Sequence, residues 1–127
     1  MTGNTLRITP FMHVEDLNSA AAFMTDILGF EIRFFDGPGG YAYVCREGAG
    51  IRILASANAA ERGKPHGGFQ YYIDVRNLDV VLDQIGEKLE QLPEGTVIGP
   101  RDQPYGQREL MIRAPDGNLI VFGQALN

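Results

Sequence analysis

Residues 14–17 read Val-Glu-Asp-Leu and residues 75–78 read Val-Arg-Asn-Leu, so the pattern Val-x-(Asp or Asn)-Leu occurs twice, 61 positions apart. In both places the Asp or Asn precedes apolar residues with the three-and-four spacing of an amphipathic helix, which is where an N-cap is expected. A second pair follows in the same order, because residues 48–51 and 117–120 both fit Gly-x-x-Ile. Two matches in the same order predict an internal duplication.

The residues around these matches predict one strand, one helix and three further strands in each half of the chain. Helices are expected from Asp16 to Leu28-Gly29 and from Asn77 to Pro93-Glu94-Gly95. The expected strands cover residues 8–14, 30–35, 41–46 and 51–54, then 69–75, 97–98, 109–113 and 119–122. Residues 55–68 are polar and aperiodic, which is typical of a connection. We therefore expect one α+β domain over residues 1–127, with module one at 6–54 and module two at 69–125.

Composition and charge narrow the class of protein. The chain has 127 residues, 44% of them hydrophobic, and a formal net charge of −5 without a basic stripe, which argues against nucleic-acid binding. No apolar run approaches the roughly 20 residues that a membrane span needs. Cys45 is the single cysteine, so no internal disulfide can form, and the first residues lack signal-peptide character. We expect a cytoplasmic protein with neither membrane nor nucleic-acid partners.

Several motifs resemble the vicinal oxygen chelate superfamily, which contains glyoxalase I, bleomycin-resistance proteins, fosfomycin-resistance enzymes and extradiol dioxygenases. The resemblance covers roughly residues 6–125. It is most specific at the C-terminal end, where the chain is similar to the bleomycin-resistance branch. It implies two βαβββ modules, each a curved mixed or antiparallel half-sheet, around a concave site, and a homodimer in which modules pair across subunits. The residues that carry it are 14–17, Phe23, 28–30, 75–78, 104–109 and 113–120.

In the metal-using branches of that family, the first and last strands of each module supply His, Glu or Gln ligands. The matching positions here are Thr9, Arg52, Gln70 and Val121. Valine offers no ligand atom, and the permanent charge of arginine repels a cation, so only Gln70 is a suitable donor. No His-x-x-x-His or Cys motif compensates. We expect no metal, no cofactor and no catalytic residue, which argues against an enzyme.

What remains is a ligand-binding surface on the concave side of the strands. Strand alternation places Phe11 and His13 there if Ile8, Met12 and Val14 pack beneath the first helix. An aromatic pair with a few polar groups and an apolar floor suits a flat organic ligand. The residues expected to bind it are Thr9, Phe11, His13, Arg52, Gln70, Tyr72, Tyr105, Glu109 and Val121. Leu54, Asp74, Met111 and Arg113 share this side.

Three points stay open at this stage. Arg52 has either to pair with an acid such as Asp74 or Glu109, or to meet an anionic group of the ligand. His13 forms an acid–base pair with one of the same acids, or it is a rim histidine without function. Phe34, Phe35, Tyr41 and Tyr43 wall the site or belong to the core, and Tyr105 is a candidate lid.

The favoured function is therefore a metal-free small-molecule binding protein of the glyoxalase/bleomycin-resistance type that sequesters a flat aromatic or cationic ligand. Two alternatives remain. One is a metal-dependent lyase, isomerase or dioxygenase of the same superfamily, and the other is a ligand-free scaffold. The expected partners are a small-molecule ligand and a second copy of the chain. The identity of the ligand does not follow from the sequence.

Overall fold

The computed structural model describes residues 3–55 and 68–127, and the strands of this part of the chain form two four-stranded sheets. The first sheet has the order β1-β4-β3-β2 and the second the order β5-β8-β7-β6. The strands are β1 (Phe11–Val14), β2 (Glu31–Asp36), β3 (Tyr41–Arg46), β4 (Ala49–Ala55), β5 (Gln70–Asp74), β6 (Val97–Asp102), β7 (Gln107–Arg113) and β8 (Leu119–Ala125). Most of the predicted connection at residues 55–68 lies outside the described residues.

The two sheets repeat one topology. In each, the first strand runs parallel to the last, and the other neighbours are antiparallel. This confirms the predicted α+β fold of two βαβββ units. The first strand is shorter than predicted, since β1 starts at Phe11 and Ile8 is 92% exposed instead of packing beneath a helix. Strand β6 is longer than predicted, because it continues to Asp102 past a register shift between Ile98 and Arg101.

Each half contains one helical segment with the predicted cap. Helix α1 (Leu17–Ala22) continues directly into a π-helical turn, η1 (Phe23–Ile27), and helix α2 covers Leu78–Glu90. The Asp16 side chain accepts a hydrogen bond from the Asn18 amide at 3.1 Å, and the Asn77 side chain accepts one from the Asp79 amide at 2.9 Å. These bonds satisfy donors that a helix start otherwise leaves free.

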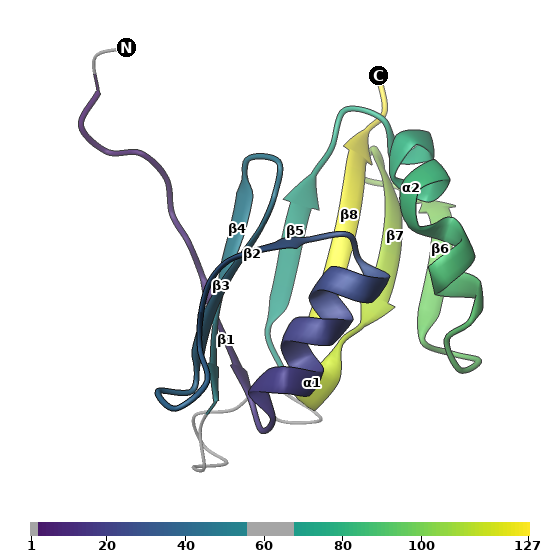
Figure 1. The fold of residues 1–127 in the computed structure, drawn as a ribbon. Coiled ribbons are helices and arrows are strands. Elements are labelled where there is room, and N and C mark those ends of the chain that lie inside the picture. The colour runs from purple at the N-terminus through teal and green to yellow at the C-terminus, as the bar shows by residue number, and fades with distance from the viewer. Residues whose placement is uncertain (1–2, 56–67) are drawn as a thin grey trace.

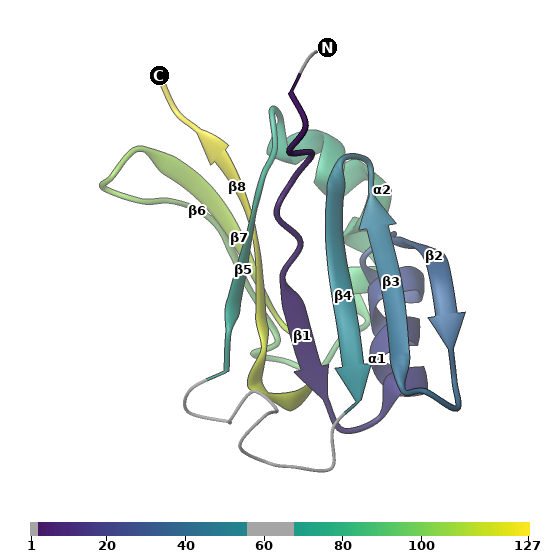
Figure 2. The ribbon, with the colours of Figure 1, turned by 90° about the vertical axis from the view of Figure 1, so that its left-hand side faces the viewer.

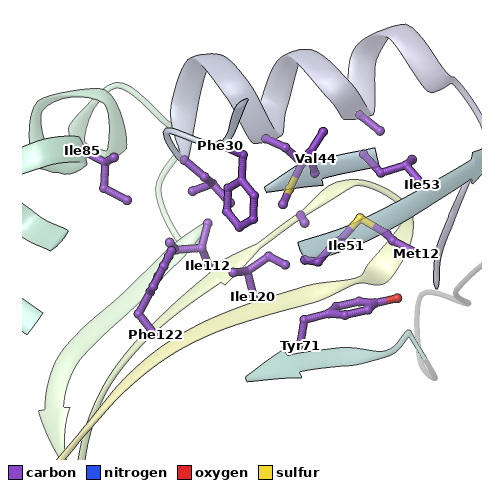
Figure 3. Close-up of a cluster of buried hydrophobic side chains, with 14 of the residues drawn as sticks. Met12, Phe30, Val44, Ile51, Ile53, Tyr71, Ile85, Ile112, Ile120 and Phe122 are labelled. Carbon is purple, nitrogen blue, oxygen red and sulfur yellow. The ribbon is translucent and has the colours of Figure 1, made fainter. Parts of the chain in front are cut away.

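The helical segments and the inner faces of both sheets share one apolar core (Figure 1). Helix α1 packs on β3 and β4, α2 packs on β7 and β8, and α2 also contacts η1. Figure 3 shows side chains of the first half, such as Phe30 and Val44, in one cluster with Ile112 and Ile120 of the second. Each sheet therefore buries one face and turns the other away from the core. No helix among the described residues is long and apolar enough to cross a membrane.

Three hydrogen bonds tie β1 and the residue that follows it to the second half of the chain. The Tyr71 hydroxyl of β5 donates to the Phe11 carbonyl at 2.9 Å. The Asn118 side-chain amide, next to the short 3₁₀ turn η2 (Pro115–Gly117), donates to the His13 carbonyl at 3.2 Å. The Glu15 amide donates to the Asp116 carboxylate at 3.1 Å. The family-like turn thus joins the two halves.

Candidate functional site

The outer face of the β1-β4-β3-β2 sheet is rich in aromatic side chains. Met12 and Val14 are fully buried, so their neighbours Phe11 and His13 point to the outer face. The strand register sets Phe11 beside Arg52, Arg52 beside Tyr43 and Tyr43 beside Phe34. This face is turned toward the viewer in Figure 2, with both helices behind the sheet.

The rings of Phe11, Tyr41 and Phe34 form a platform on this outer face, in which Tyr41 is half-buried and the other two are exposed. The ring centroids of Phe11 and Tyr41 are 6.5 Å apart, and those of Phe34 and Tyr41 are 5.8 Å apart. Phe11 is 47% exposed and Phe34 is 54% exposed, so these rings are not core residues. We call Phe11, Phe34, Tyr41 and Tyr43 the aromatic face. Phe35 is not part of it, because it pairs with the buried Ala42 and points to the opposite side of the sheet.

The Arg52 guanidinium lies within the aromatic face and is held by neutral groups. Its Nε donates to the Thr9 hydroxyl at 2.8 Å, and its Nη1 donates to the Tyr41 hydroxyl. Its Cζ stacks 4.6 Å from the centroid of the Tyr43 ring, a cation–π geometry. Within residues 3–55 and 68–127 no carboxylate forms an ion pair with it. Pairing with Asp74 or Glu109, one of the two expected outcomes, does not occur within the chain.

The outer face of the second sheet carries a buried acid held by two phenols. Glu109 is 3% exposed. Its Oε2 accepts a hydrogen bond from the Tyr72 hydroxyl at 2.9 Å, and its Oε1 accepts one from the Tyr105 hydroxyl at 2.8 Å. Loss of hydration at the phenol is the largest cause, and this hydrogen bond the next, of a rise in the pKa of Tyr72 to about 12. The bond to Glu109 also raises the pKa of Tyr105. Both phenols therefore remain neutral donors at physiological pH.

A glycine makes this cluster possible. Tyr72 lies on β5 and Glu109 on β7, so the phenol has to cross β8 between them. It crosses over Gly123, where an added Cβ would lie 2.0 Å from the Tyr72 hydroxyl oxygen. Sequence reasoning placed Tyr72 and Glu109 on one side of the sheet but missed their contact. The available signal was Gly123, an isolated glycine directly after the predicted apolar strand 119–122.

The second open point concerns His13, which has no acid partner in the part of the chain that the structure describes. Both Glu109 oxygens are taken by tyrosine hydroxyls, and no hydrogen bond joins His13 to Asp74 among the described residues. The His13 ring stacks on Phe11 with a centroid distance of 6.5 Å and an interplanar angle of 28°. Its buried Nδ1 lacks a hydrogen-bond partner in the described part of the chain. The acid–base pair is therefore not formed.

The four family positions for metal ligands do not fit a metal. Thr9 and Arg52 lie on the first sheet's side of the molecule and Gln70 and Val121 on the second sheet. The Thr9 hydroxyl already accepts from Arg52, and Val121 has no donor atom and is 1% exposed. Over the described ranges no three His, Cys, Asp or Glu side chains gather into a group that could hold a metal ion.

A cavity of 760 Å³ lies along the edge between the two sheets. The residues before β1, the β3–β4 turn, β5 and the start of α2 line it. Of the predicted site residues it contains Gln70 and Tyr72, whereas Arg52, Glu109 and the aromatic face lie outside it. The structure thus brings the predicted residues together in two groups, Thr9, Phe11, His13 and Arg52 on one face and Tyr72, Tyr105 and Glu109 on the other.

Comparison with known proteins places this geometry in a family. The model of the Glyoxalase/Bleomycin resistance protein/Dioxygenase superfamily matches residues 7–122. Three solved structures share the fold. The bleomycin-binding protein from Streptomyces verticillus, complexed with copper(II)-bleomycin, is 22% identical (TM-score 0.74), with 99% of this chain and 100% of that chain covered. The bleomycin resistance determinant of transposon Tn5 is 23% identical (TM-score 0.74; 95% and 98% covered). Lactoylglutathione lyase from Agrobacterium tumefaciens is 20% identical (TM-score 0.68; 93% and 92% covered). A search of curated proteins found no match.

Proposed function

The chain belongs to the Glyoxalase/Bleomycin resistance protein/Dioxygenase superfamily, and from that premise we propose that it is a metal-free binding protein that sequesters a flat aromatic small molecule. The observation that carries the proposal is the exposed aromatic face. Soluble proteins rarely leave several neighbouring aromatic rings in water without a binding role. The Streptomyces verticillus protein of similar fold binds bleomycin, which supports ligand binding as the activity. The residues at the family's metal positions include Arg52 and Val121, which do not ligate a metal ion, and this supports binding without a metal.

We further propose that the binding groove is completed by a second copy of the chain in the cytoplasm. Both outer faces turn away from the shared core and do not face one another, so one copy does not close both around the same ligand. Their chemistry is complementary, since apolar aromatic rings lie on one face and the polar Tyr72–Glu109–Tyr105 cluster lies on the other. Facing the first sheet of one copy with the second sheet of the other would bury the aromatic rings against polar partners.

A thermal-shift screen tests the proposal. Flat aromatic compounds and cationic glycopeptide drugs should include some that raise the melting temperature, because a ligand that binds only the folded state stabilises it. Phe34→Ala should reduce that rise, since it removes a ring of the aromatic face. Phe35→Ala is the matched control, because the neighbouring ring points away from this face. Absence of stabilisation by every compound at high concentration would refute the proposal.

A further inference from the structure

We propose that Arg52 binds an anionic group carried by the aromatic ligand, so that the ligand is an aromatic acid and not an aromatic cation. This inference rests on the proposed function and narrows its ligand class. Its starting point is the set of partners that Arg52 has among residues 3–55 and 68–127. These are a threonine hydroxyl, a tyrosine hydroxyl and a tyrosine ring, all of them neutral.

A guanidinium on a partly covered surface needs a counter-charge or open water to offset its lost hydration. Arg52 is half-buried, and no described carboxylate supplies the charge. Among the described residues, the bonds to Thr9 and Tyr41 use two of its five N–H donors and leave the others for a further acceptor. Stacking on Tyr43 fixes the plane of the fork, which suits bidentate binding of a carboxylate.

The surroundings define the rest of the ligand. Phe11 stands beside Arg52 in the strand register, and the Phe34 and Tyr41 rings continue the platform. A flat ring lying on this platform would bring a directly attached carboxylate to the guanidinium. The acids of the second sheet do not supply the charge within the chain. Both oxygens of the buried Glu109 already accept from tyrosines, and Asp74 forms no ion pair with Arg52.

Three probes with one ring system separate charge from shape: naphthalene-2-carboxylate, naphthalene-2-carboxamide and naphthalen-2-ylmethylammonium. Calorimetric titration of the wild-type protein at neutral pH should give the carboxylate an affinity at least about tenfold above the other two, the scale of a charge-assisted hydrogen bond. The net charge of −5 works against any anion, so this preference would report a local site.

Variants then assign the preference to one residue. Arg52→Gln should lower the affinity for the carboxylate probe to that for the carboxamide probe. Arg52→Lys keeps the positive charge but loses the planar guanidinium, so its affinity for the carboxylate probe should lie between those of the wild type and Arg52→Gln. Arg33→Gln is the control, because it removes an equal charge from an exposed arginine of the same sheet whose nearest acid is Glu31. The wild-type comparison needs no variant, so it remains decisive if an Arg52 variant folds poorly.

The outcomes distinguish this inference from the proposed function. Equal binding of carboxylate and carboxamide by the wild type, or a preference that survives in Arg52→Gln, would overturn the inference and leave the binding function standing. Tighter binding of the ammonium probe would overturn it as well. If none of the three binds, the aromatic face is not a ligand surface, and the proposed function falls together with the inference.

Discussion

Gly123 shows how one small residue positions a polar cluster. Its missing side chain lets the Tyr72 phenol lie across β8 and reach Glu109, which is buried and would otherwise lack a donor on Oε2. A buried carboxylate oxygen without a hydrogen bond is costly, so the glycine and the phenol act together. Gly86 in α2 differs, because an added Cβ there would meet nothing within 4 Å.

Alanine at these two glycines should therefore have opposite effects. Gly123→Ala should lower the free energy of unfolding by about 1–3 kcal/mol, since it displaces Tyr72 and strips Glu109 of one donor. Gly86→Ala should raise it by about 0.5–1 kcal/mol through helix propensity. Urea unfolding midpoints measure both. A Gly123→Ala protein as stable as the wild type would show that the Tyr72–Glu109 bond contributes nothing to folding.

At the scale of helices and strands, the sequence correctly predicts the features that depend only on residues close to one another in the chain. The caps at Asp16 and Asn77, the apolar stripe of α2 and the end of the first helical segment at Leu28-Gly29 depend on neighbours a few residues away, and each was predicted correctly. The long β6 was missed, because Gly99-Pro100 resembles the end of a strand while the pairing resumes after the bulge. Contacts across strands, such as Arg52 with Tyr41, need a register that no local pattern contains.

The cap of α1 should make stability depend on pH. Hydrogen bonds from the Ser19 hydroxyl, then from backbone amides, hold the pKa of Asp16 below its ordinary value of 3.8. Its contribution is therefore complete above pH 3.8 and is lost as the pH falls through the lower folded-state pKa. Asp16→Asn keeps a capping oxygen but cannot titrate.

Urea unfolding of both proteins at neutral pH and at a pH of about 3 checks this expectation. The free energy of unfolding of the wild type minus that of Asp16→Asn should be smaller at the acidic pH. Both proteins contain the same other acidic residues, so the contributions of these residues cancel in the subtraction. A difference that does not change between the two pH values would mean that Asp16 is not preferentially ionised in the folded state.

At the scale of the whole molecule, the exposed rings argue for self-association. Phe11, Phe34, Tyr72 and Tyr105 are each more than 40% exposed, and they occupy outer faces of both sheets. The predicted pairing of modules across subunits would cover them. Alternation placed Phe11 and Tyr72 on outer faces, whereas Phe34 was left open between site and core and Tyr105 was expected on a loop. Which face meets which depends on a second chain.

Light scattering coupled to gel filtration should therefore give a mass of twice 14.0 kDa. The dimer should dissociate on dilution more readily in Phe34→Ser than in Phe35→Ser, because only the first ring lies on the aromatic face. A mass of one chain at every concentration would contradict the proposed groove between two copies, while leaving the fold and the anion site on a single sheet intact.

The core that the two halves share has a practical consequence. Each helix packs on the sheet of its own half, but the apolar side chains of β1–β4 and of β5–β8 form one cluster, so a separate half would leave part of that cluster in water. Two fragments, ending at Ala55 and starting at Gly68, should therefore stay unfolded when made separately and regain structure when mixed. A split pair of this kind would serve as a reporter in which proximity of two fused proteins restores ligand binding.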